Sequence, residues 1–130
     1  MYYLTTKSSV DFDATVSTVR LALQQQGFGI ISEINLQAKL QEKTGADVGR
    51  YLILGACHPP SALSAVQAEP NIGVMLPCNV IVRESNNCIE VSAINPQVSM
   101  RAIKNPALHG VAATVQQALQ NVIHDVRVRA

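Results

Sequence analysis

The chain has 130 residues, of which 48% are apolar and 15% charged, and its net charge is +1. This length predicts one domain, residues 1–130, with a hydrophobic core. The balanced charge without a basic cluster excludes a nucleic-acid surface, and no apolar run has the length of a membrane span. The first residues lack the pattern of a signal peptide, so we expect a cytoplasmic protein whose three cysteines are reduced.

The first part of the chain predicts a strand followed by a long helix. Residues 2–7 contain two tyrosines and two threonines, which favour a strand. Asp11 predicts a helix N-cap and Gly27 the end of that helix. One apolar stripe at helical spacing lies between them: Phe12, Val16, Val19 and Leu23.

The middle of the chain predicts two strands and two shorter helices. Residues 28–34 predict a strand, and the leucines that follow predict a short helix closed by a turn at 44–47. Residues 50–56 are apolar at nearly every position, which predicts a strand in the centre of the sheet. Two prolines then open a helix over 61–69, because proline fits the first helical turn.

The last part predicts a hairpin and a second long helix. Residues 75–84 and 88–94 predict two strands joined by a turn at 85–87. A short helical turn is expected over 98–103. Asn105 and Pro106 then begin a helix with a long apolar stripe: Leu108, Val111, Ala112, Val115, Leu119, Val122, Ile123 and Val126.

These elements predict an α+β fold in β-α-β(4)-α order with short extra helices. The sheet is expected to be mostly antiparallel, with two long helices packed on one of its faces.

Cys57 is the first candidate for a functional group, because it ends a strand directly before a helix begins. A helix N-terminus lowers the pKa of a nearby thiol and favours the reactive thiolate. The alternative is a small apolar residue at the end of a buried strand, which is a common role for free cysteine.

Cys78 is the second candidate, and strand alternation assigns it to one face of the sheet. It shares that face with Val80 and Val82, so we expect it to point into the core. A redox pair with Cys57 requires the two sulfurs to be within disulfide reach. Cys88 is expected near the surface and without a role.

Other polar residues give weaker indications of a site. His58 is a candidate base beside Cys57, or only the residue at the helix start. Glu33 is either a solvated carboxylate or an acid in a cleft, and the solvated alternative is preferred. A Cys-His pair with a distant cysteine and no fourth ligand predicts no metal site. We expect no cofactor.

The chain resembles domain-of-unknown-function family 302 from its first strand to its last helix. Four segments carry the resemblance: Gly27–Ile34, Leu54–Pro60, Ala68–Gly73 and Leu76–Val82. The residues that match the family pattern are Gly27, Phe28, Gly29, Glu33, Gly55, Cys57, Pro59, Pro60, Glu69, Pro70, Pro77, Cys78 and Asn79. The family usually has asparagine where this chain has His58, which argues against a general role for that imidazole.

The resemblance implies a fold like that of the TATA-box-binding protein and a homodimer, but no activity, cofactor or substrate. A fold of that name does not imply DNA binding here, because the charge pattern opposes it. The candidate binding residues are Glu33, Gly55, Cys57, His58, Pro59, Pro77, Cys78 and Asn79.

Three functions are consistent with the sequence. The preferred one is a homodimeric module that binds an apolar or thiol-linked small molecule. The second is a thiol-dependent redox or sulfur-handling enzyme that uses Cys57 with Cys78. The third is a structural or regulatory subunit in which these motifs only shape turns. No nucleic-acid or membrane partner is expected.

Overall fold

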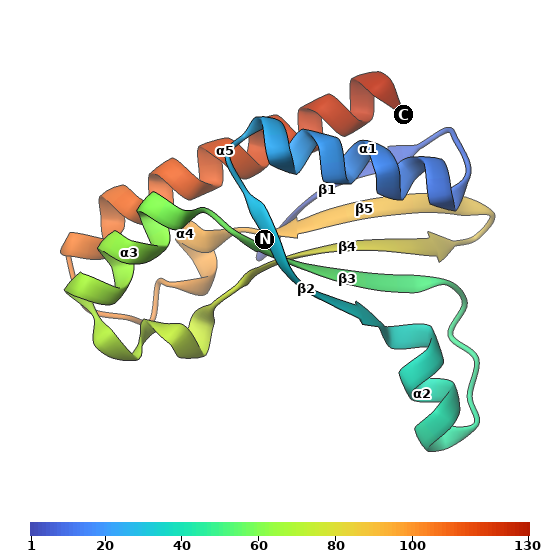
Figure 1. Cartoon of the computed structure of the whole chain (residues 1–130), viewed down its shortest axis with the longest axis horizontal. Helices are drawn as coiled ribbons and strands as arrows, with labels where there is room; N and C mark the ends of the chain where they lie inside the picture. The colour runs from blue at the N-terminus through green and yellow to red at the C-terminus, as the bar shows by residue number, and fades with distance from the viewer.

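A five-stranded sheet and two long helices form the body of the protein in a computed structural model that describes residues 1–130 (Figure 1). The elements in chain order are β1 (Tyr3–Ser8), α1 (Phe12–Gln25), β2 (Gly29–Asn35), α2 (Leu36–Thr44), β3 (Tyr51–Cys57), α3 (Pro59–Ala68), a 3₁₀ helix η1 (Pro70–Met75), β4 (Cys78–Ser85), β5 (Cys88–Ile94), α4 (Pro96–Ser99) and α5 (Ala107–Arg129). The predicted α+β class and element order are confirmed.

The sheet is antiparallel throughout, with strand order β1-β5-β4-β3-β2. The prediction that residues 50–56 form the central strand is wrong in detail, because β3 is internal but β4 occupies the centre. An apolar strand therefore indicated an internal position and not a central one. The predicted hairpin is confirmed: Ser85 pairs with Cys88, and both loop residues, Asn86 and Asn87, have positive φ. This backbone matches the twist of the two strands.

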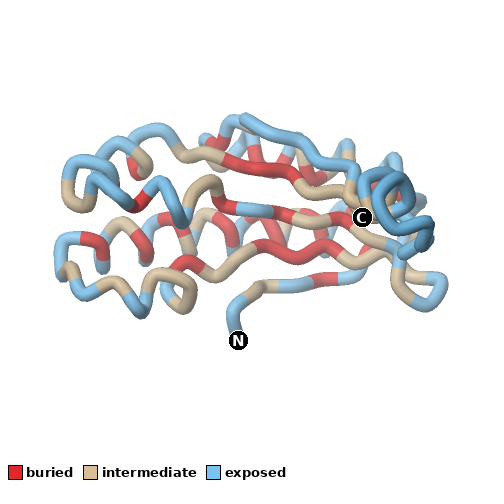
Figure 2. Tube along the Cα trace, turned by 90° about the horizontal axis from the view of Figure 1, so that it is seen from below, coloured by how far each residue is buried: buried red, intermediate tan, exposed pale blue.

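Helices α1 and α5 cover one face of the sheet, and their apolar stripes form the core with the strands (Figure 1). Figure 2 shows the buried residues concentrated in the middle of the strands and on the inward sides of the helices. The largest fully buried core side chains are Val19, Leu23, Leu54, Val80, Val82, Val91, Leu119, Val122 and Val126.

Local capping explains where several helices begin and end. Asp11 accepts a hydrogen bond from the Ala14 amide at 2.7 Å, as its N-cap assignment predicts. Gly27 has a φ of +84°, a conformation that glycine adopts without strain, and it turns the chain from α1 toward β2.

The predicted boundaries differ most from the structure at two elements. The strand expected from Met75 begins only at Cys78, because residues 70–75 form η1 and Pro77 has no amide for a sheet hydrogen bond. The helical turn expected over 98–103 is the helix α4, Pro96–Ser99. It begins earlier because Asn95 caps it and Pro96 is its first residue.

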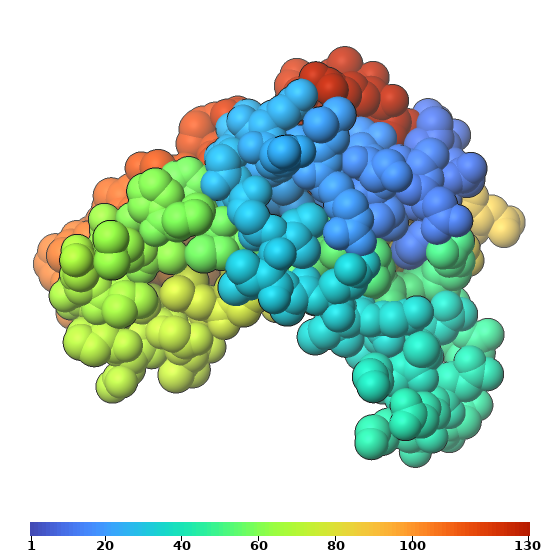
Figure 3. Space-filling view, viewed as in Figure 1, coloured from blue at the N-terminus to red at the C-terminus, as the bar shows by residue number.

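The second face of the sheet carries no helix layer. Helix α2 and the segment after it project from the body as an arm (Figures 1 and 3), and no residue of α2 is buried. None of the helices has the length and apolar composition that crossing a bilayer requires.

Candidate functional site

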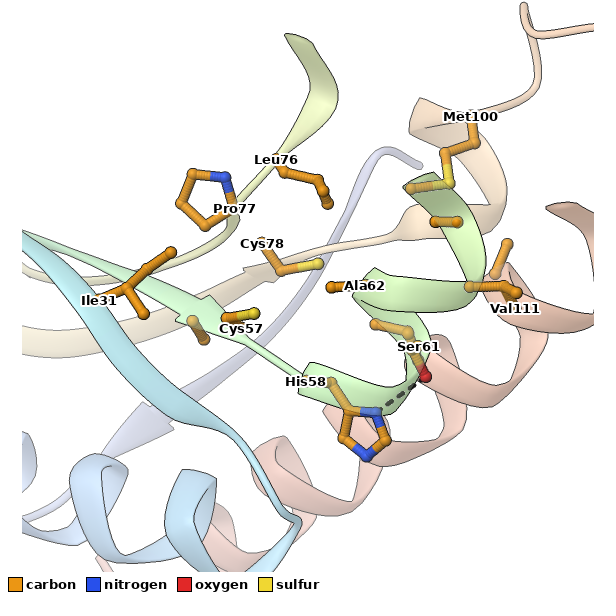
Figure 4. A pocket seen from close by; sticks show the side chains of 14 residues that line it. Ile31, Cys57, His58, Ser61, Ala62, Leu76, Pro77, Cys78, Met100 and Val111 are labelled. Atoms are coloured by element: carbon orange, nitrogen blue, oxygen red, sulfur yellow. Dashed lines mark hydrogen bonds between the residues drawn. The ribbon is translucent and has the colours of Figure 1, made fainter. Parts of the chain in front are cut away.

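A small apolar cavity lies at the end of the sheet, where β3 and β4 meet α3 and α5 (Figure 4). Its volume is about 90 Å³, several times the roughly 15 Å³ that one water molecule needs. Eleven of its 14 lining residues are hydrophobic. The complete set of lining residues is Ile31, Ala56, Cys57, His58, Ser61, Ala62, Ala65, Leu76, Pro77, Cys78, Met100, Val111, Ala112 and Val115.

Small side chains on the two helices leave this space unfilled. Ala62 and Ala65 face it from α3, and Ala112 faces it from α5. Larger side chains at these positions would fill the space between the helices and the strand ends. Ile31 is 65% exposed and lies at the rim, so the cavity reaches the protein surface there.

Cys57 is the last residue of β3 and is half-buried. Its partner in the sheet, Gly29, belongs to β2, and α3 begins two residues after it. Strand alternation points Cys57 to the face opposite that of Ala56. The cavity lies beyond the end of the sheet and not over one face, so the Cys57 side chain still reaches it. Figure 4 shows its sulfur on the cavity side.

Cys78 begins β4 and is buried with only 8% of its surface exposed, on the face it shares with Val80 and Val82, as alternation predicts. Burial, and to a lesser extent the nearby Cys57, raises the pKa of its thiol to about 11. Cys78 is therefore a neutral thiol at neutral pH. Both cysteines are free, so no disulfide joins them.

His58 connects the beginning of α3 with the turn between α1 and β2 through its side-chain contacts. Its Nδ1 shares a hydrogen bond of 2.8 Å with Ser61 Oγ, and its ring meets the Phe28 ring edge-on at 5.3 Å. The other ring nitrogen lies over Gly27, where a Cβ would approach it to 3.4 Å. These contacts give His58 a packing role, and its hydrogen bond is directed to Ser61 and not to Cys57.

Pro77, which lines the cavity, packs tightly against Gly55, which lies behind it. A Cβ at Gly55 would lie 2.7 Å from Pro77 Cγ and would clash with Ser32 Oγ. The peptide bond between Leu76 and Pro77 is cis. Gly55 thus permits the close approach of three backbone segments, and this requirement explains why glycine stands at this point of β3.

The structure brings four of the predicted site residues together at the cavity: Cys57, His58, Pro77 and Cys78. Gly55 and Pro59 do not line it, and Asn79 lies in a separate groove on the uncovered face of the sheet. Glu33 also lies outside the cavity. Its carboxylate pairs with Arg20 of α1 in an exposed position, which agrees with the solvated alternative.

Sequence reasoning missed the opposite wall of the cavity. Ser61, Met100 and Leu76 line it, together with residues of α5 that the apolar stripe assigned only to the core. The one available signal was the run of small residues after the two prolines, where a core-facing helix usually carries larger side chains. The structure has no cluster of three or more His, Cys, Asp or Glu side chains that could hold a metal ion.

The fold and the cavity together define a small α+β domain with a thiol-lined apolar pocket at the end of its sheet. The chain belongs to the family described as "Domain of unknown function DUF302", whose model matches residues 4–126. It is similar to the protein in the "Crystal structure of uncharacterized conserved protein DUF302 from Bacillus stearothermophilus", with 26% identity and a TM-score of 0.91 over 98% of this chain and 99% of that one. None of the curated proteins matches the chain. The likeness to the TATA-box-binding protein stays a prediction.

Proposed function

We propose that the protein is a homodimeric module that binds a small apolar or thiol-linked molecule in the cavity at the end of its sheet. The observation that carries this proposal is the cavity itself. It is lined almost entirely by hydrophobic side chains, and two free thiols lie in its wall. Ligand sites in proteins are typically concave and mostly apolar, with a few polar groups that orient the ligand.

The polar groups of the cavity limit the chemistry of the ligand. Ser61 and His58 already bond to each other, and no charged side chain lines the wall. A charged ligand that forms no bond to the thiols would lose its hydration without a compensating partner, which is costly. A ligand of few atoms, uncharged and apolar, fits these walls best, and the thiols offer a point of covalent attachment.

Toluene is a suitable test ligand because it is small, apolar and unreactive. We expect it to raise the melting temperature and to shift the amide NMR signals of residues around the cavity. Ala62→Leu fills the cavity and should abolish both effects, whereas Ala113→Leu at an exposed position of α5 should preserve them. Equal binding by both variants, or no response by the native protein, would contradict the proposal.

The homodimer is supported by the composition of the uncovered sheet face. Ile34, Ile53 and Ile81 form a continuous cross-strand row on that face, directly paired in the sheet. All three tyrosines of the chain line one groove there with Ile81. Tyrosine-rich apolar surfaces are typical of protein interfaces.

Charge on the same face fits a second copy of this chain as the partner. Arg83 and Glu90 lie opposite each other in β4 and β5 and form an ion pair of 3.2 Å. An interface with two-fold symmetry requires a surface complementary to itself. A neighbouring cation and anion meet this requirement, because each can face its opposite on the partner.

The thiol-dependent enzyme remains the second candidate, favoured by the presence of both thiols in one cavity wall. The raised pKa of Cys78 opposes a role for it as a thiolate at neutral pH. Alkylation with iodoacetamide at several pH values, read by mass spectrometry, distinguishes the candidates. Reaction at Cys57 no faster than that of an ordinary thiol, with a pKa of about 8.5, would exclude the enzyme.

We also propose that the protein is cytoplasmic. All three cysteines are free in the structure, which suits a compartment that keeps thiols reduced.

A further inference from the structure

The cavity brings together three of the six sulfur-containing side chains of this chain. Cys57 and Cys78 line it from the strand ends, and the thioether of Met100 lines it from the segment after α4 (Figure 4). No carboxylate, lysine or arginine contributes to the wall. The only imidazole, His58, directs Nδ1 to Ser61. The donors that face the cavity are therefore predominantly soft.

The sheet register places the two cysteines at neighbouring strand ends. Cys78 pairs directly with Ala56, so Cys57 is one residue away from the partner of Cys78 on the neighbouring strand. Strand spacing and rise place the two Cα atoms roughly 6 Å apart. A bridging ion with metal–sulfur bonds of about 2.3 Å holds two sulfurs within roughly 4.6 Å of each other, which this separation allows.

We propose that Cys57 and Cys78 bind one soft monovalent cation of the Cu(I) class between their sulfurs, with Met100 as a weaker third donor. Thiolate and thioether ligands select soft ions, whereas Mg²⁺ and Ca²⁺ require oxygen donors. A soft monovalent ion accepts two or three sulfur ligands, so the absence of a fourth ligand, which argues against zinc, does not argue against it.

Binding replaces protons and involves no change of oxidation state. The ion arrives as Cu(I), each thiol gives one proton to solvent, and two metal–sulfur bonds form. Metal affinity therefore rises with pH. Burial of Cys78 opposes the loss of its proton, so the metal–sulfur bonds must offset this cost.

A competition titration tests the proposal. Reduced protein is mixed without oxygen with Cu(I) held by bathocuproine disulfonate, and the loss of the coloured complex is measured. We expect one ion per chain. Cys57→Ser should weaken binding at least about 100-fold, since even changes beyond the direct ligands cost about 10- to 100-fold. Met100→Leu should have a smaller effect.

Cys88→Ser is the matched control, because Cys88 lies outside the cavity at the hairpin end of β5. It should bind like the native protein. Because Cys57 is half-buried, its serine variant is expected to fold, and circular dichroism checks this. X-ray absorption of the complex should show sulfur neighbours only.

Native binding equal to that of Cys57→Ser, loss of binding in Cys88→Ser, or no transfer from the chelator would overturn the proposal. The toluene experiment is performed on metal-free protein. Failure of Cu(I) binding with toluene binding intact would reject only the metal site, and the reverse result would reject only the proposed ligand.

Discussion

Gly55 of β3 and Ser32 of β2 are in such close contact that a Cβ on the glycine would overlap the serine hydroxyl. Pro77 closes the same space from the segment before β4, 2.7 Å from that Cβ position. This contact brings the end of β2 and the beginning of β4 against β3 directly behind the cavity. The position of Cys57 and Cys78 thus depends on a residue that does not line the cavity.

Gly55→Ala should destabilise the protein by at least about 2 kcal/mol, because the added methyl group overpacks a site that two neighbours already fill. Gly29→Ala is the matched control in the adjacent strand, where a Cβ would meet nothing within 4 Å. That variant should stay within about 0.5 kcal/mol of the native protein. Urea unfolding measures both.

The double variant Gly55→Ala with Ser32→Ala should recover part of the lost stability, since the serine hydroxyl makes the closest contact. Equal stability of the Gly55 and Gly29 variants would show that the strand ends can move apart at no cost.

The pH dependence of stability should report the burial of Cys78. Its pKa is about 11 in the folded chain and near its ordinary 9.0 in the unfolded chain. Between these values the folded state holds more protons, so the free energy of unfolding falls as pH rises. The contribution is fully present below pH 9 and is lost by pH 11, a change on the order of 3 kcal/mol.

Urea unfolding of reduced protein at pH 8, 9.5 and 10.5 measures this slope. The quantity compared is the difference in unfolding free energy between the native protein and Cys78→Ala, which removes the contribution of the other ionisable groups. Cys88→Ala should keep the native slope. A difference that does not change with pH would mean that the Cys78 thiol is exposed to water.

His58→Asn should preserve stability, whereas His58→Ala should cost about 1–2 kcal/mol. The histidine is the N-cap of α3 but makes no side-chain capping bond. Pro59 and Pro60 have no amide hydrogen, so an asparagine at position 58 would accept from the Ser61 amide. This bond offsets the lost contacts with Phe28 and the Ser61 hydroxyl.

Thermal unfolding compares the two His58 variants under the same conditions. If asparagine and alanine destabilise equally, capping does not matter here, and the ring of His58 is needed for its packing alone.

The proposed dimer is tested by placing a charge on the uncovered sheet face. Ile34→Asp should weaken self-association at least about tenfold, because an unpaired carboxylate would be buried in an apolar interface. Leu21→Asp on α1 is the control, and the two side chains are similarly exposed in the single chain, at 43% and 45%. Sedimentation velocity over a range of concentrations gives the dissociation constants.

A native protein that stays monomeric at high concentration would contradict the dimer. Equal weakening by both substitutions would locate the interface elsewhere.

Most of the elements could be predicted because their signals are local. Asp11 caps α1, Gly27 ends the turn after it, and two asparagines form the tight hairpin loop. The stripe from Leu108 to Val126 follows from the period of the helix alone. Strand alternation likewise predicted that Cys78 points into the core, because alternation depends only on positions within one strand.

The fold class, the long helices and the residues that form a core follow from the sequence alone, because periodicity and capping involve neighbours along the chain. The set of residues that share the cavity became known only from the three-dimensional packing. Glu33 belongs to a motif of the family yet pairs with Arg20, whereas Met100 belongs to none of these motifs and lines the cavity with both thiols. The physical reason is that strand ends, a 3₁₀ turn and two helices meet there, and no local pattern records how distant segments pack.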